Sequence, residues 1–185
     1  MLTQLKEAAM AYGLTLAPKE IFVDFEQGSI KAFKFHFPGA KITGCHFHFT
    51  SAIYKKICEL GLKKVYSENV CFKSWIRKIM ALPFLKLKPN EDESDIDLCW
   101  DELKSERVDL GETDNKKLDQ FTEYCETTWL NSSAMFLREI WNLHDNIFHR
   151  SNNISENKSI NQILISRAVK FTLLYTLPNF APHFV

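Results

Sequence analysis

Apolar positions in the first sixty residues follow two alternating spacings. Residues 2–12 have apolar side chains every three or four positions, which predicts an amphipathic helix that Gly13 ends as its C-cap. Residues 20–25 then contain a short apolar run, which is typical of a buried strand. This strand delivers Asp24 at its C-terminal end, where ligands of open α/β sheets gather.

Predicted strands and helices continue to alternate up to residue 60, and only helices are predicted in the middle of the chain. The pattern predicts a helix over 26–37, a second strand over 40–45 and a helix over 46–60. Strand, helix, strand, helix is the order of an α/β sheet. Further along, 72–80 and 119–129 have helical spacing and strand signals disappear. We therefore expect one α/β domain with a mainly helical region in its middle.

The C-terminal part has one long helical pattern. Apolar residues from Ile160 to Leu174 keep helical register, and Asn153 or Ser155 is a natural N-cap that places Glu156 in the first turn. Charged residues and a proline interrupt the most apolar stretch, 160–180, so it lacks the roughly 20 apolar residues that a membrane crossing needs. We expect a long C-terminal helix and no transmembrane segment.

Composition limits the class of protein. The 185 residues are 45% hydrophobic and 25% charged, which is ordinary for a globular domain. Lys plus Arg and Asp plus Glu number 23 each, so any nucleic-acid binding has to come from a local patch and not from a global positive field. The five cysteines form no CxxC pair, and the N-terminus does not resemble a signal peptide. These features favour an intracellular protein that is not secreted.

Residues 89–97 concentrate five carboxylates without a basic residue. Such a run is typical of a solvated loop, and the alternative is a metal or partner site. We predict a solvated loop for this segment.

Several short motifs, taken together and in order, resemble the transposase domain of the Mutator-like (MULE) family. They are Asp24-Phe25-Glu26, Phe37-Pro38, Gly44-Cys45-His46-Phe47-His48, Gly61-Leu62, the segment 81–85, Thr128-Trp129, Trp141-Asn142, and Arg150-Ser151-Asn152-Asn153 with Glu156. Each motif is short, but their order and spacing extend over most of residues 1–170, which we assign to the transposase-like domain, with 171–185 as the helix end and tail.

The resemblance implies a fold and a chemistry. It implies a partial RNase H-like α/β fold with a mainly helical insertion at about 65–148 and a long C-terminal helix. The family's three carboxylates, usually called the DDE triad, hold two divalent metal ions for DNA transposition by phosphodiester hydrolysis and strand transfer. Asp24 matches the second acid and Glu156 the third, and the family's Cys-x-x-His signature falls on Cys45 and His48.

Two-metal chemistry explains why such acids converge. Metals about 3.5–4 Å apart hold both the attacking and the leaving oxygen, and Mg²⁺ or Mn²⁺ prefers carboxylate ligands. In the family the first aspartate lies on an earlier strand, whereas the only acids before Asp24 here are Glu7 and Glu20. We therefore expect an incomplete metal site and no DNA cleavage by this chain alone.

The resemblance also implies partners, and it leaves three interpretations of function. DNA is the implied partner, the nucleus is the implied location, and a full-length transposase or a second copy could complete the site. The first interpretation is a catalytic domain completed by other sequence. The second is a non-catalytic relic that binds DNA or a transposase. The third is a decayed copy without function.

Each candidate residue also has a structural interpretation. Asp24 could cap a helix, and Glu156 could complement a helix dipole. Cys45 and His48 could form a zinc site with two later histidines, His144 and His149, but a buried cysteine and a hydrogen-bonding histidine are the interpretation we favour, so zinc is not expected.

Aromatic and basic residues of the helical region are ambiguous in the same way. Trp75, Trp129 and Trp141 could stack on DNA bases, but we predict that they fill the core. The basic residues around two predicted helices could contact phosphates or simply form a solvated face. They are Lys55, Lys56, Lys63, Lys64, Lys73, Arg77 and Lys78.

Overall fold

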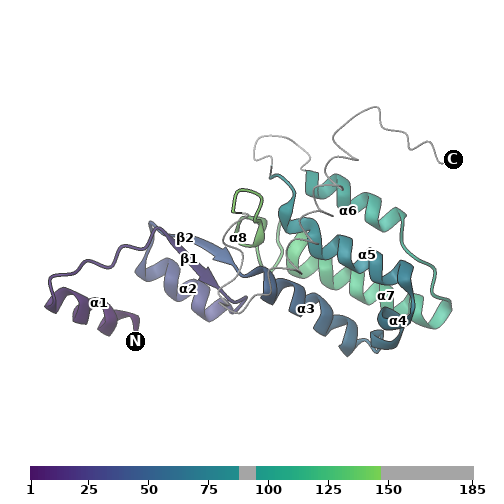
Figure 1. Cartoon of the computed structure of the whole chain (residues 1–185), viewed down its shortest axis with the longest axis horizontal. Coiled ribbons are helices and arrows are strands. Elements are labelled where there is room, and N and C mark those ends of the chain that lie inside the picture. Colours follow the sequence, from purple (N-terminus) through teal and green to yellow (C-terminus); the bar gives the residue numbers. More distant parts are fainter. Residues whose placement is uncertain (88–94, 147–185) are drawn as a thin grey trace.

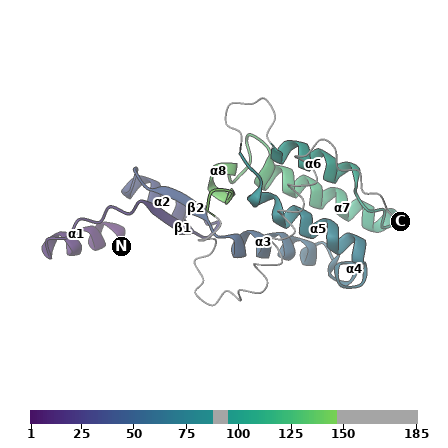
Figure 2. The same ribbon diagram turned by 45° about the horizontal axis from the view of Figure 1, so that its top comes forward.

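The computed structural model describes residues 1–87 and 95–146 (Figure 1). Its elements in chain order are α1 (Leu2–Ala11), β1 (Glu20–Val23), α2 (Gln27–His36), β2 (Lys41–Gly44), α3 (His46–Glu59), α4 (Lys63–Glu68), α5 (Val70–Ala81), η1 (Leu82–Phe84), α6 (Asp95–Ser105), α7 (Glu112–Cys125), η2 (Glu126–Leu130) and α8 (Arg138–Trp141). The described part is elongated, with α1 at one end, the strands next to it and the longer helices at the other end (Figures 1 and 2).

The strands form a parallel pair, as the strand-helix-strand pattern predicts. Glu20 pairs with Lys41 and Val23 with Gly44, and α2 is the crossover between the strands. Residues 42–44 of β2 are buried, whereas β1 becomes buried only at Val23. The helix α8 packs against β2 and covers it (Figure 1).

The predicted helices of the first sixty residues are confirmed to within two residues at each end. Gly13 and Gly61 follow α1 and α3 with φ of +70° and +73°, the left-handed conformation that glycine adopts most readily. The helix predicted over 119–129 begins earlier, at Glu112, and widens into a π-helix over Glu126–Leu130. Its polar first turns carry little apolar signal, which is why the pattern places the start too late.

The acidic segment requires a correction. Residues 95–97, predicted as part of a solvated loop, form the first turn of α6, while 88–94 lie outside the described residues. Ile96 is fully buried, so this turn packs against the core. Its carboxylates, Asp95 and Asp97, stand at the helix N-terminus, where the helix dipole favours negative charge.

Aromatic side chains form the centre of the core between the strands and the helices. Trp129 packs edge-on against Phe25 and Phe49, with ring centroids 4.7 and 4.8 Å apart, and Trp141 stacks on Phe49 at 5.5 Å. Trp75, Trp129 and Trp141 are at most 3% exposed. The prediction that these tryptophans fill the core is confirmed.

The segment after α8 joins the helical part to the strands. The Leu143 N–H donates to the Pro83 carbonyl at 2.7 Å, and the Asn142 side-chain amide donates to the Leu85 carbonyl at 2.7 Å. At the strands, the Asn146 amide donates to Glu20 at 2.6 Å. Residues 142–146 therefore link η1 and the residue after it to the start of β1 by hydrogen bonds.

The described protein is thus a mixed α/β fold that is mostly helical, with a two-stranded parallel sheet. The predicted mainly helical region corresponds to the helices from α4 to α8. The predicted C-terminal helix, which carries Glu156, lies outside the described residues. No helix within 1–87 or 95–146 is long and apolar enough to cross a membrane.

None of the five cysteines is in a disulfide, and their burial predicts different reactivities. Cys71 is exposed, whereas burial raises the pKa of Cys99 to about 12 and raises that of Cys125 well above its ordinary value. Because the thiolate is the nucleophile, iodoacetamide near pH 8 should label Cys71 much faster than Cys99 or Cys125, as mass spectrometry of tryptic peptides would show. Labelling in guanidinium is the control, and equal rates at Cys71 and Cys99 in the folded protein would contradict this burial.

Candidate functional site

The candidate site lies where the two parallel strands end. Asp24 directly follows β1, and Cys45 directly follows β2 and precedes α3. The Cys45 N–H donates to the Val23 carbonyl at 2.9 Å, so the two strand ends are joined by a further hydrogen bond. The sequence predicts Asp24 near the end of one strand and Cys45 at the end of the next, and the structure brings these two ends together.

His48 contacts Asp24 across this edge. His48 lies in the first turn of α3, and its Nδ1 is 3.1 Å from Asp24 Oδ1. The nitrogen itself is buried, and the contact does not have the geometry of a hydrogen bond. The Asp24 side chain is 54% exposed and that of His48 is 36% exposed. The carboxylate is therefore accessible to a solvent ion.

Phe25 fixes the backbone next to Asp24. Its ring lies in the aromatic core, with centroids 4.7 Å from Trp129 and 5.2 Å from Phe136. Asp24 is exposed, whereas the Phe25 ring is packed against the core, and the Glu26 N–H donates to the Asp24 carbonyl at 2.8 Å in a tight turn. This anchoring contact could not be read from the sequence, because no local pattern links Phe25 to residues more than a hundred positions later.

The residues of the Cys-x-x-His signature have different surroundings. Cys45 is fully buried at the start of α3, as the structural interpretation predicts. His46, between them in sequence, is also buried, and its Nε2 lies 3.1 Å from the Met80 carbonyl. His48 lies 3.1 Å from Asp24 through its Nδ1. Of the two signature residues, Cys45 is thus buried in the core, and His48 is at the site.

The site can be compared with what a divalent metal needs. A solvent-accessible carboxylate at the carboxyl end of a strand is a suitable oxygen ligand for Mg²⁺ or Mn²⁺, and Asp24 fits this requirement. Within 1–87 and 95–146, no three His, Cys, Asp or Glu side chains are grouped closely enough to hold a metal ion. Glu156, the other predicted ligand, and His149, considered for zinc, lie outside the described residues, and His144 contacts Asp145 at 2.8 Å.

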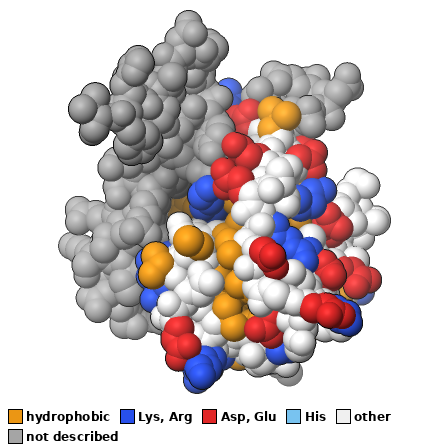
Figure 3. All heavy atoms as spheres, turned by 90° about the vertical axis from the view of Figure 1, so that its right-hand side faces the viewer, with side chains coloured by type: hydrophobic (Ala, Val, Ile, Leu, Met, Phe, Trp, Pro, Cys, Tyr) orange, Lys and Arg blue, Asp and Glu red, His pale blue; other side chains and the backbone are white. Residues whose placement is uncertain are grey.

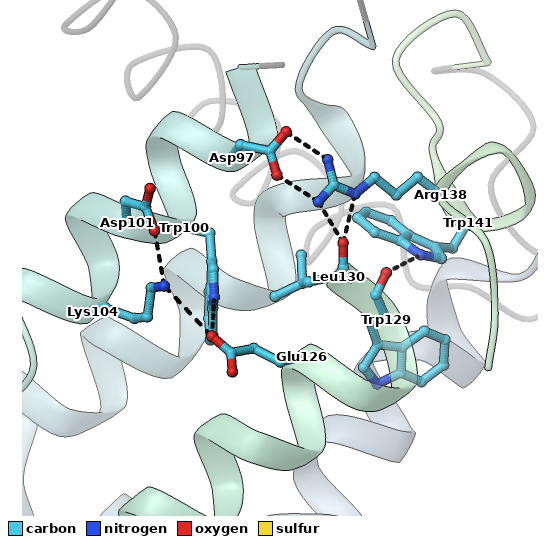
Figure 4. A network of polar contacts seen from close by, with 9 residues as sticks. All are labelled: Asp97, Trp100, Asp101, Lys104, Glu126, Trp129, Leu130, Arg138 and Trp141. Carbon is cyan, nitrogen blue, oxygen red and sulfur yellow. Dashed lines mark hydrogen bonds and ion pairs between the residues drawn. The ribbon is translucent and has the colours of Figure 1, made fainter. Parts of the chain in front are cut away.

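A second polar cluster, which the sequence analysis missed, joins α6, η2 and α8 (Figure 4). Arg138 donates to both carboxylate oxygens of Asp97, at 2.8 and 2.5 Å, and its Nε donates to the Leu130 carbonyl at 2.9 Å. Glu126 accepts from the Trp100 indole at 3.1 Å and contacts Lys104 at 3.5 Å. Asp97 and Arg138 are 41 residues apart, so only their opposite charges could have suggested the pair.

This cluster lines an open hollow of about 610 Å³. The hydrogen bond from Lys104 to Asp101, at 2.8 Å, raises the pKa of the lysine and keeps it charged. Lys104 and Arg138, the cations of the hollow, are each paired with acids of the same hollow. We therefore assign this cluster to holding three elements together, and not to binding a charged ligand.

Comparisons of the chain with protein families, with curated proteins and with solved structures each give no match. The assignment of a function to the strand-end site therefore depends on its geometry and on the motif resemblance.

Proposed function

We propose that this chain contains part of the catalytic domain of a Mutator-like transposase, in which Asp24 is a metal-binding carboxylate for DNA phosphoryl transfer. The observation that carries the proposal is the contact between Asp24 and His48, at 3.1 Å. The two motifs that resemble the family, 24 residues apart, meet at the C-terminal edge of a parallel strand pair. Ligands of α/β sheets bind at that edge.

In this proposal each described residue has a limited role. Asp24 offers a carboxylate oxygen to a Mg²⁺ or Mn²⁺ ion, which would activate water or a DNA hydroxyl and stabilise the leaving oxygen. His48 positions Asp24 from the first turn of α3, and Phe25 holds the backbone in place. Glu156 is proposed as a further metal ligand. A full-length transposase would supply the family's first acid, and the site would work in the nucleus.

A second candidate is a non-catalytic relic that binds DNA or a transposase. One observation favours it: the described residues bring one carboxylate and one imidazole together, and not three metal ligands. The two candidates differ in a measurable property, because only the first needs divalent metal at Asp24.

Metal titration tests the proposal. Isothermal titration of Mn²⁺ and Mg²⁺ should detect binding in the wild type and a loss of at least about tenfold in affinity after Asp24→Ala or Glu156→Ala, since each removes a charged ligand. Asp145→Ala is the matched control, because it also removes one exposed carboxylate. Asp145 precedes Asn146, whose side-chain amide donates to Glu20 at the start of β1, and Asp24 follows the other end of that strand. No metal binding by the wild type, or equal weakening in the control, would reject the catalytic interpretation and favour the relic.

A further inference from the structure

The helix α1 carries an apolar stripe that faces solvent. It consists of Met1, Leu5, Ala8 and Tyr12, which we call the α1 stripe. Met1, Leu5 and Tyr12 are 94%, 53% and 85% exposed, and the alanine is exposed as well. At about 100° of rotation per residue, the four positions lie within about 60° of one another around the helix axis. Their spacings of four, three and four residues are those of a coiled-coil seam, which a second helix normally covers.

The contact of α1 with α2 leaves this stripe uncovered. Lys6 Nζ donates to the His36 carbonyl at 3.1 Å and lies 5.4 Å from the centroid of the Phe37 ring. Lys6 is about 130° around the helix from the middle of the stripe, so α2 packs on a different side of α1. No residue of α1 is buried, and the helix projects from one end of the described part (Figure 1). Since isolated helices shorter than roughly 12–15 residues are only marginally stable, further apolar cover would stabilise this 10-residue helix.

A second copy of α1 has the shape to cover the stripe. In an antiparallel pair whose two-fold axis passes between residues 6 and 7, Leu5 lies opposite Ala8 of the second copy. In the same pair, Met1 lies opposite Tyr12 of the second copy. Each leucine fills the space that the small alanine leaves, so the two helices can approach closely. The methionine sulfur and the tyrosine ring form a favourable contact at each end of the pair. The same four residues on both copies are therefore complementary, as a two-fold interface requires.

Charge also favours a second copy as the partner of the stripe. The positions that flank the stripe are uncharged, so two copies meet there without like-charge repulsion; they are Leu2, Gln4, Ala9 and Ala11. The first turn of α1 contains no acidic residue and its last turn no basic residue, so its own side chains do not offset the helix dipole. Antiparallel pairing brings the opposite partial charges of the two helix ends together. At the other end of the molecule, charged side chains of both signs border a hydrophobic band, which makes that end less suited to apolar self-association (Figure 3).

We propose that the α1 stripe binds the α1 stripe of a second copy of this chain, so that the protein forms an antiparallel homodimer through this helix. Exposed aromatic side chains offer roughly 150–250 Å² each and the others less, so the pair buries at most about 1,000 Å² in total. A standard interface buries about 1,600 Å², and smaller interfaces belong to weak, reversible complexes. We therefore expect the dimer to form at micromolar or higher concentrations. The inference does not rest on the proposed function, because neither Asp24 nor a metal ion takes part in the pairing.

The test is sedimentation equilibrium of the full chain between about 5 and 500 µM, where weak complexes of this size dissociate. The weight-average mass of the wild type should rise with concentration from that of a monomer toward that of a dimer. Leu5→Glu should raise the dissociation constant at least about tenfold, because pairing would bury its carboxylate against an alanine. Met10→Glu is the matched control, because Met10 is also apolar and is 75% exposed but lies on the opposite side of α1 from the stripe. This control should associate as the wild type does.

Three results would overturn the inference. They are a wild type that stays monomeric at every concentration, equal weakening in both variants, and a Leu5→Glu variant that associates as the wild type does. Both variants introduce glutamate into the same helix, so a difference between them does not come from helix propensity. If circular dichroism shows that Leu5→Glu loses helix, Leu5→Ala replaces it and should weaken association at least about threefold, since alanine favours helix but removes apolar contact. Asp24→Ala should dimerise as the wild type does, so a failed metal titration beside an intact dimer would reject the catalytic proposal alone.

Discussion

Replacing Trp141 by alanine should lower the free energy of unfolding by about 3–5 kcal/mol, the range for large aromatic side chains in a core. Trp141 is 1% exposed and stacks on Phe49 with centroids 5.5 Å apart. Its indole N–H donates to the carbonyls of Trp129 and Phe136, at 3.1 and 3.2 Å. The substitution leaves a cavity between the strands and the helices and removes the donor that holds both carbonyls.

Urea denaturation followed by far-UV circular dichroism measures this loss. Phe35→Ala is the matched control, because it also deletes an aromatic side chain but at a position that is 81% exposed, and it should change stability by less than about 0.5 kcal/mol. If the two variants unfolded at similar urea concentrations, Trp141 would not be buried in the core as described.

Gly44→Ala should destabilise the protein by about 1–3 kcal/mol, as overpacking of a full core does. An added Cβ would lie 2.6 Å from Cε1 of the Phe25 ring and 3.2 Å from the Ile140 carbonyl oxygen. The ring cannot move away easily, because it packs against Trp129 at 4.7 Å and Phe136 at 5.2 Å. Displacing Phe25 would also move Asp24, so Mn²⁺ affinity should fall together with stability.

The comparison is with Gly39→Ala, where an added Cβ meets no atom within 4 Å. This variant should be neutral or slightly stabilising, because alanine restricts the unfolded chain. Thermal unfolding of the two variants side by side is sufficient. A Gly44→Ala protein as stable as Gly39→Ala would show that β2 and Phe25 are not in close contact.

The sequence was most informative where one spacing persisted over several turns or along a strand. Both strands, α2 and α3 follow from such runs, because apolar burial dominates their local energetics. The helix α6 also had a signal, since Ile96, Cys99 and Leu103 are buried at helical spacing. The surrounding carboxylates obscured it, because charge density was taken as a sign of solvent exposure.

The candidate site was predictable in part. The pattern placed Asp24 and Cys45 at the ends of two parallel strands, and parallel pairing brings those ends together by geometry alone. The inward packing of Phe25 and the pairing of Asp97 with Arg138 depend on side chains far apart in sequence, for which period and composition carry no information. The third predicted carboxylate, Glu156, lies outside the described residues, so its convergence with Asp24 stays a prediction.

The hydrogen bond between Glu20 and Asn146 closes a loop of 126 residues, which has a consequence for how the chain folds during synthesis. The helices α3, α4 and α5 are near neighbours in sequence and can pair soon after they leave the ribosome, because short loops are quickly closed. The strand pair emerges before them but receives its cover from α8 about a hundred residues later. At translation rates of roughly 5–20 residues per second, several seconds pass between the synthesis of β2 and that of α8. During this time the outer edge of β2 is uncovered, and a chaperone or another chain can pair with it.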